Sequence, residues 1–155
     1  MTSAIHHGQF TLERTYAATA ERVYDAWSDL GAKSHWFIGP EQWRELRREL
    51  DFRVGGHEVL QGRHASNRIT LYSARFHALT AARRIVFVYD MHLDEIHHST
   101  SLATVELAPT SSGTRLRFTE QVAFLDGTEG VASREHGTAE HLDRLSAYLA
   151  RGTAH

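Results

Sequence analysis

Apolar residues recur at every second position between about Trp43 and Phe124, and at helical spacing between about Ser133 and Arg151. A period of two is that of a strand with one buried face, and a period of 3.6 is that of a helix. A sheet of this length must cover one face, and the terminal helix is the main element left to do so. The pattern therefore predicts an α+β domain in which a curved antiparallel sheet packs against a long C-terminal helix, with room for a cavity between them.

The alternation divides into about seven strands joined by turns. Their approximate ranges are 10–16, 43–54, 57–61, 67–77, 83–90, 97–107 and 114–124. Thr19 is a typical helix N-cap, and two short helices are expected after the first strand, before Gly39 and Pro40 break the backbone. The final helix is expected to begin at Ser133 and to bury an apolar stripe of Leu142, Leu145, Tyr148 and Leu149.

Composition limits the classes of function. The 155 residues contain no cysteine, and 17 basic and 19 acidic side chains give a formal net charge of -2 without a basic stripe. These features argue against disulfides, thiolate metal sites and nucleic-acid partners. No apolar run approaches the ~18 residues of a membrane span. We therefore expect a soluble, cytoplasmic protein with no nucleic-acid or membrane partner, built as an N-terminal tail (1–9) and one domain (10–151).

Six short segments occur in a fixed order along the chain. They are Arg14 to Tyr16, Glu21 to Trp27, Trp36 with Phe37, Asp51 to Gly56, Gly113 to Glu120, and His141 to Leu149. Together they resemble the Activator of Hsp90 ATPase homologue-like family of the START/Bet v 1-like (SRPBCC) superfamily, over about residues 10–150. The resemblance implies a helix-grip fold whose cavity, across the superfamily, holds lipids, sterols, polyketides and other apolar ligands.

Two departures from the family pattern limit what the resemblance implies. Family members commonly have a tryptophan directly after the glycine of the final helix, whereas Gly137 is followed by Thr138, so one wall of the pocket should be smaller or more polar. The eukaryotic co-chaperone that gives the family its name has an additional N-terminal domain, for which this chain has no room. A chaperone partner is therefore not expected. A co-chaperone-like interaction module, with an exposed apolar patch around Trp36 and Trp43, stays an alternative.

The leading hypothesis is that a small hydrophobic or amphipathic molecule binds in the cavity. Trp36, Phe37 and Trp43 flank the Gly39-Pro40 break, where the cavity should open. Gly137, inside the last helix, indicates either close approach of sheet or ligand or a late start of the helix. The predicted ligand site consists of Trp36, Phe37, Trp43, Arg48, Phe52, Tyr72, Phe87, Tyr89, Glu120, Gly137 and Leu142.

Polar side chains in the inward register leave two interpretations open. Glu120 shares the apolar face of the last strand, and a buried carboxylate is costly unless it is paired. Arg14, on the first strand, is a candidate structural partner because the first and last strands are neighbours in a helix-grip fold. Alternatively, Glu120, Arg48 or His97 orients a ligand. In a cyclase-like or dehydratase-like enzyme, the second alternative function, Glu120 or His97 would act as general acid or base.

The sequence contains no specific motif for other chemistry. There are twelve histidines, but His97 and His98 should point to opposite faces of a strand, and His136 with Glu140 lacks a third ligand at a useful spacing. No serine lies in the sharp turn that activates a hydrolase nucleophile. We therefore expect no metal, no cofactor and no catalytic residue. A homodimer formed through an edge of the sheet is left open by the sequence.

Overall fold

The structure is a computed structural model that describes residues 4–152. Within this range a single sheet of seven strands is combined with three helices. In chain order the elements are β1 (His6–Tyr16), α1 (Ala20–Ser28), α2 (Leu30–Lys33), β2 (Arg44–Leu50), β3 (His57–Arg63), β4 (Ile69–Thr80), β5 (Arg84–Leu93), β6 (Ile96–Thr110), β7 (Gly113–Phe124) and α3 (Val131–Gly152).

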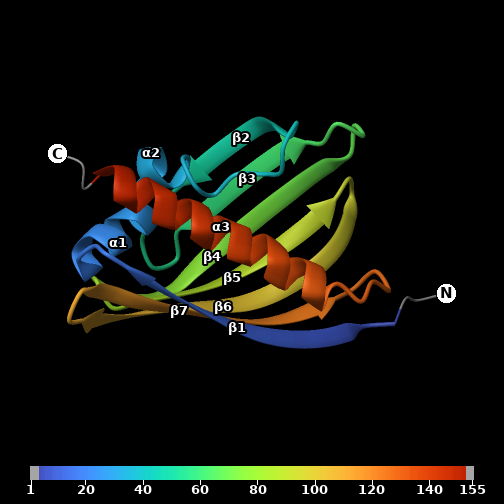
Figure 1. Cartoon of the computed structure of the whole chain (residues 1–155). Helices are drawn as coiled ribbons and strands as arrows, with labels where there is room; N and C mark the ends of the chain where they lie inside the picture. Colours follow the sequence, from blue (N-terminus) through green and yellow to red (C-terminus); the bar gives the residue numbers. More distant parts are fainter. Residues whose placement is uncertain (1–3, 153–155) are drawn as a thin grey trace.

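The sheet has the order β1-β7-β6-β5-β4-β3-β2, and every neighbouring pair is antiparallel. Strands β2 to β7 form a meander, and the last strand, β7, pairs with the first strand, β1. The sheet curves around α3, which crosses it obliquely (Figure 1). The predicted curved antiparallel sheet, long C-terminal helix and two short helices after the first strand are therefore confirmed.

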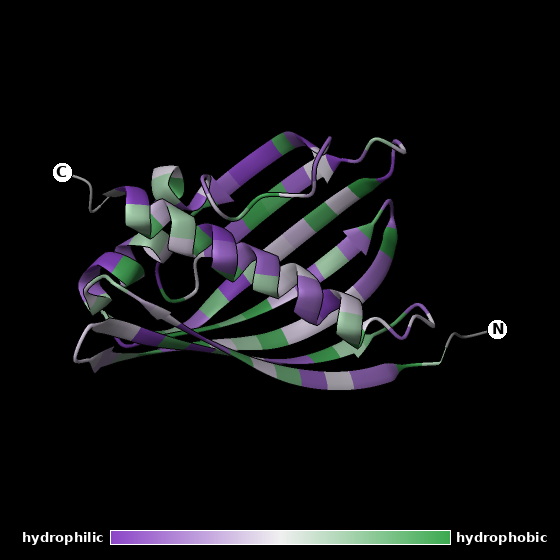
Figure 2. Ribbon diagram, in the orientation of Figure 1, coloured by the Kyte–Doolittle hydropathy of each residue, from purple (hydrophilic) through white to green (hydrophobic). Residues whose placement is uncertain are grey.

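The core lies between the concave face of the sheet and the helices. Along β7, the inward side chains from Thr114 to Phe124 are buried at every second position. Hydrophilic and hydrophobic residues form bands of different colour along the strands of the sheet (Figure 2). On α3, the stripe of Leu142, Leu145 and Leu149 is at most 3% exposed. The hydroxyl of Tyr16 donates to the carbonyl oxygen of Leu142 at 3.0 Å, which fixes the middle of α3 to β1.

Several boundaries differ from the sequence prediction. β1 begins at His6, inside the predicted tail, because β7 extends to Phe124 and pairs with residues 6–9. A Cβ at Gly8 would lie 1.8 Å from Cγ2 of Val131, so the extension of β1 is also packed closely against the start of α3. The helix starts at Val131, two residues before the predicted cap.

The β2 edge shows why strict alternation fails there. A bulge between Glu45 and Arg47 shifts the register of β2 against β3, and the apolar side chain of Leu46 is 41% exposed. β2 is also the most hydrophilic strand (Figure 2). Among residues 4–152, no helix has the combination of length and hydropathy that crossing a membrane requires.

Candidate functional site

A cavity of about 610 Å³ lies between the concave face of the sheet and the N-terminal half of α3. Strands β3 to β7 form its floor, α3 forms one side, and the segment 36–43 between α2 and β2 forms the other. The apolar part of the lining includes Trp27, Leu60, Met91, Phe118 and Phe124 in addition to the predicted aromatic residues. The space between sheet and helix is therefore not filled by side chains.

Nine of the eleven residues predicted as the ligand site line this cavity: Trp36, Phe37, Trp43, Tyr72, Phe87, Tyr89, Glu120, Gly137 and Leu142. Many of them touch one another. The ring centroids of Phe37 and Tyr72 are 4.9 Å apart, as are those of Tyr72 and Tyr89. The structure thus brings these side chains together, while their contact with a ligand stays a prediction.

The structure places Arg48 and Phe52 outside the cavity. Arg48 lies on the edge strand β2, where Nη2 donates to the carbonyl oxygen of Phe37 at 2.8 Å and Nε pairs with Glu45 at 2.9 Å. Phe52 follows the end of β2 and packs edge-on against Tyr24 and Phe76. Arg48 therefore holds the segment 36–43 in place, and Phe52 belongs to the core under α1.

Trp43 occupies a slot formed by two glycines. A Cβ added at Gly39 would lie 2.3 Å from the indole ring, and one added at Gly62 would lie 1.8 Å from it. The indole Nε1 donates to Oγ1 of Thr70 at 3.4 Å. The two glycines are thus required by the close approach of this ring, which forms part of the cavity lining.

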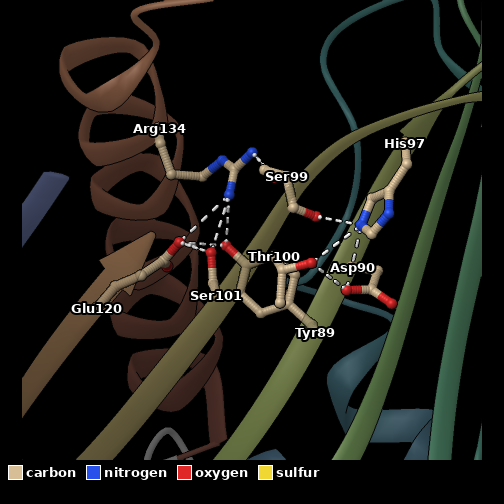
Figure 3. A network of polar contacts seen from close by, with 8 residues as sticks. All are labelled: Tyr89, Asp90, His97, Ser99, Thr100, Ser101, Glu120 and Arg134. Atoms are coloured by element: carbon tan, nitrogen blue, oxygen red, sulfur yellow. Dashed lines mark hydrogen bonds and ion pairs between the residues drawn. The ribbon is translucent and has the colours of Figure 1, made fainter. Parts of the chain in front are cut away.

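Glu120 is the centre of a buried polar network on the cavity floor (Figure 3). Its Oε2 accepts hydrogen bonds from the Tyr89 hydroxyl at 2.6 Å, the Ser101 hydroxyl at 2.7 Å and Nη1 of Arg134 at 3.2 Å. Nη2 of Arg134 donates to Oγ of Ser99 at 2.7 Å. Glu120 has no solvent exposure, and its Oε1 has no hydrogen-bond partner among residues 4–152.

The electrostatics of this network keep its donors protonated. Burial raises the pKa of the Tyr89 hydroxyl, and the neighbouring Glu120 carboxylate raises it further. Burial opposes the charge on Arg134, but Tyr89 and Glu120 outweigh it and raise the pKa of the guanidinium. Tyr89 therefore serves as a hydrogen-bond donor, and Arg134 compensates the buried carboxylate.

The predicted pairing of Arg14 with Glu120 is wrong. The residue opposite Glu120 in the register of β1 and β7 is Phe10, whereas Arg14 lies opposite Leu116. The Nε of Arg14 reaches α3 instead and pairs with Asp143 at 2.9 Å. The two strands are neighbours as expected, but the register separates the two side chains by four residues along the strand.

Sequence reasoning missed Arg134 because the inward face of the predicted helix was not followed back to its first turn. A signal was present. Arg134 precedes Leu142 by eight residues and Leu145 by eleven, which are spacings that keep side chains on one helix face. Extending the apolar stripe of α3 backwards by two turns would have placed Arg134 toward the sheet, within reach of Glu120.

A second buried ion pair was also missed. Nζ of Lys33, the last residue of α2, lies 2.7 Å from Oε1 of Glu58 on β3, and both side chains are at most 4% exposed. The rings of Trp27, Trp36 and Phe37 surround the ammonium with centroids at 5.2, 5.8 and 5.0 Å. Burial lowers the pKa of Lys33, and the charge of Glu58 opposes that effect.

The histidines lie in several separate environments. His97 does not line the cavity, because the pairing of β5 with β6 shifts register beside His92 and its ring stacks on that of His92. Its Nε2 lies 2.9 Å from Oγ1 of Thr100 and 3.3 Å from Asp90. Ser99 lies between this outer cluster and the Glu120 network (Figure 3).

His98, which does line the cavity, places Nδ1 2.7 Å from Oδ2 of Asp126 in the loop before α3. On α3, His136 pairs with Glu140 at 2.8 Å, as their helical spacing allows. No group of three or more His, Cys, Asp or Glu side chains within 4–152 is arranged to hold a metal ion. The arrangement as a whole offers aromatic walls with two buried ion pairs, which is the chemistry of a binding pocket.

Comparison with known proteins identifies relatives of the whole domain. The family model described as Activator of Hsp90 ATPase homolog 1-like protein matches residues 17–150. The solved structure of an uncharacterised protein from Rhizobium leguminosarum is 36% identical, with a TM-score of 0.91 over 96% of this chain and 97% of that chain. A protein from Rhizobium loti is 37% identical, with a TM-score of 0.87 over 94% and 99% of the two chains.

A more distant likeness shows the fold alone. The AHSA1-like protein from Aeromonas hydrophila is 18% identical and has a TM-score of 0.69, with 94% of each chain covered. No curated protein sequence matches the chain. The family match covers most of the sequence, and the resemblance noted in the six sequence segments is confirmed. The chain therefore belongs to the Activator of Hsp90 ATPase homologue 1-like family.

Proposed function

We propose that the protein binds one small, mainly apolar molecule in the cavity between the sheet and α3. The observation that carries the proposal is the cavity of about 610 Å³ itself, which lies within the size range of small-molecule sites. A close-packed core leaves few voids larger than a water molecule, so an opening of this size needs an explanation. An apolar occupant would bury its surface against the aromatic walls and gain the hydrophobic free energy of that burial.

The two alternative functions have less support. An interaction module was expected to expose an apolar patch around Trp36 and Trp43, yet Trp36 is 1% exposed and Trp43 is partly buried. An enzyme was expected to use Glu120 or His97 for proton transfer. His97 lies outside the cavity, and Oε2 of Glu120 already accepts three hydrogen bonds. We therefore propose binding without assigning a reaction.

The proposal is tested by comparing the wild-type protein with two variants of one residue. Gly137 lines the cavity, and a Cβ added there would meet no atom within 4 Å. Gly137→Trp should therefore fill part of the cavity without displacing the chain, whereas Gly137→Ala raises helix propensity at least as much and leaves the cavity open. Nile red, a neutral apolar dye, is titrated into each protein and its fluorescence is followed.

We expect one dye molecule per chain in the wild type and in Gly137→Ala, and affinity lower by about tenfold in Gly137→Trp because the occupant loses contact area. Thermal unfolding verifies that all three proteins are folded. Native mass spectrometry of freshly purified protein is the second measurement, with a retained small molecule expected in the wild type. Absence of saturable dye binding in a folded wild-type protein, or equal binding by folded Gly137→Trp, would refute the proposal.

A further inference from the structure

Every cationic side chain of Lys or Arg on the cavity wall has an acidic partner. Lys33 pairs with Glu58, and Arg134 pairs with Glu120. Arg144 has Glu140 at 4.0 Å. The lining is therefore electrically balanced, although it contains three formal positive charges.

Arg144 is held further by the protein itself. Its guanidinium donates to the carbonyl oxygens of Trp36 and Ile38, each at 3.0 Å, and to Nδ1 of His141 at 2.7 Å. These bonds tie α3 to the segment 36–43 and occupy donors that an anion would need. A ligand carboxylate would thus enter an apolar space in which no lysine or arginine within residues 4–152 is free to compensate its charge.

One strong acceptor in the lining lacks a donor. Oε2 of Glu120 accepts three hydrogen bonds, whereas Oε1 of the same carboxylate accepts none among residues 4–152. Buried polar atoms nearly always have a partner, and an unpaired charged acceptor is especially unfavourable. Because Glu120 lines the cavity, an occupant that carries an O–H or N–H group is a suitable donor.

We infer that the cavity selects a neutral amphipathic molecule that donates a hydrogen bond, from a hydroxyl or an amide N–H, to Oε1 of Glu120. This inference rests on the proposed function and adds the chemical class of the ligand. The apolar body lies against the aromatic walls, and the donor group lies at the Glu120 network. An anionic amphiphile of the same size is rejected, because it would place a second negative charge beside Glu120.

The inference is tested with three probes of equal chain length that displace Nile red near pH 7. Decanol is neutral and donates a hydrogen bond, methyl decanoate is neutral and donates none, and decanoate is anionic. We expect decanol to bind most tightly, methyl decanoate next and decanoate least, with decanoate weaker than decanol by at least about tenfold. The wild-type ranking tests the inference without requiring that a variant folds.

Glu120→Gln provides the second arm, because it removes the charge and keeps the shape. Arg134 then lacks its carboxylate, so decanoate should bind about tenfold more tightly than it does to the wild type, while decanol should weaken. Asp143→Asn is the matched control: it removes the same charge from a 67%-exposed residue of α3 that does not line the cavity, and should change each affinity by less than about twofold.

The outcomes separate the two proposals. If Nile red does not bind the wild-type protein, the proposed function fails and this inference fails with it. If Nile red binds but decanoate equals or exceeds decanol, the inference fails and the proposed function stands. Equal gains of decanoate affinity in Glu120→Gln and Asp143→Asn would also overturn the inference, because they would show an effect of net charge rather than of the Glu120 site.

Discussion

Nη1 of Arg134, in the first turns of α3, lies 3.2 Å from Oε2 of Glu120 on β7, and this ion pair joins the helix to the floor of the cavity. The carboxylate has no solvent exposure, and the guanidinium is 15% exposed. The pair therefore does two things at once. It compensates a charge inside the core, and it holds the start of α3 over the sheet at the position where the cavity is bounded by both.

Replacing Arg134 with Met should destabilise the protein strongly, because it leaves the Glu120 carboxylate buried without a counter-charge. The expected loss in the free energy of unfolding is about 3–5 kcal/mol, the usual cost of breaking a buried pair. Urea unfolding near pH 7 measures it. Arg14→Met is the matched control, because Arg14 pairs with the 67%-exposed Asp143 and should cost less than about 1 kcal/mol. Similar losses in the two variants would contradict this assignment.

The double variant Glu120→Gln with Arg134→Met tests the same pair independently of the size of each side chain. If the loss in Arg134→Met comes from an uncompensated charge, then removing the carboxylate as well should restore most of the stability. A double variant that is as unstable as the sum of the two single variants would show that the residues act separately.

Lys33 and Glu58 form the second pair for which single and double substitutions should differ. Lys33→Met leaves Glu58 uncompensated and should cost about 3–5 kcal/mol in the free energy of unfolding. Adding Glu58→Leu removes the stranded charge, so the double variant should be more stable than Lys33→Met. Thermal and urea unfolding of the four proteins give the coupling energy. A coupling near zero would mean that the aromatic rings around Nζ, rather than Glu58, compensate the ammonium.

The sequence was sufficient to predict the fold because its signals are local and repeated. Period-two alternation from Trp43 to Phe124 and helical spacing after Ser133 each extend over many residues, so an error of a few positions does not change the architecture. Nine residues chosen for inward register and position also line the cavity. Successive side chains of a regular strand point to opposite faces of the sheet, so the face of each residue can be predicted from its position in the alternating pattern.

Partners of charged residues were not predictable in the same way. The choice between Arg14 and Arg134 for Glu120 depends on the register of β1 against β7 and on how α3 packs over the sheet, and both are set by tertiary packing. A shift of four residues along β1 was enough to exchange the partner. Bulges are a second feature that the sequence did not show. One extra residue reverses the face of the side chains that follow, as at Leu46 and near His97.

Gly62→Ala should displace Trp43, because the added Cβ would overlap the indole ring at 1.8 Å. The expected result is a loss of about 1–3 kcal/mol in the free energy of unfolding, as for other overpacked sites. The fluorescence of the protein should also change, since Trp43 would leave its slot. Gly55→Ala is the control, because a Cβ added at Gly55 would meet no atom within 4 Å. The positive φ of Gly55 gives this substitution a backbone cost of its own, but it should leave Trp43 in place. An unchanged fluorescence spectrum in folded Gly62→Ala would contradict the predicted displacement.

His141 should make the stability of the protein depend on pH. Burial of its ring lowers its pKa from 6.5 to about 3, and the Arg144 guanidinium beside it adds to the effect. Between these two pH values the unfolded chain takes up a proton at His141 and the folded chain does not, so stability falls as the pH decreases. The contribution of this residue is about 1.4 kcal/mol for each pH unit.

The pH effect is isolated by comparing His141→Gln with the wild type. Glutamine offers Arg144 an acceptor in place of Nδ1 but cannot take up a proton, so the loss of stability between pH 7 and pH 5 should be smaller in the variant by about 2 kcal/mol. Urea unfolding at both pH values measures the difference, and contributions from all other titrating groups cancel. His136→Gln, which alters a 77%-exposed histidine of the same helix, should keep the wild-type dependence. If His141→Gln also keeps it, the ring of His141 is protonated in the folded protein, and its neutral role as acceptor for Arg144 is wrong.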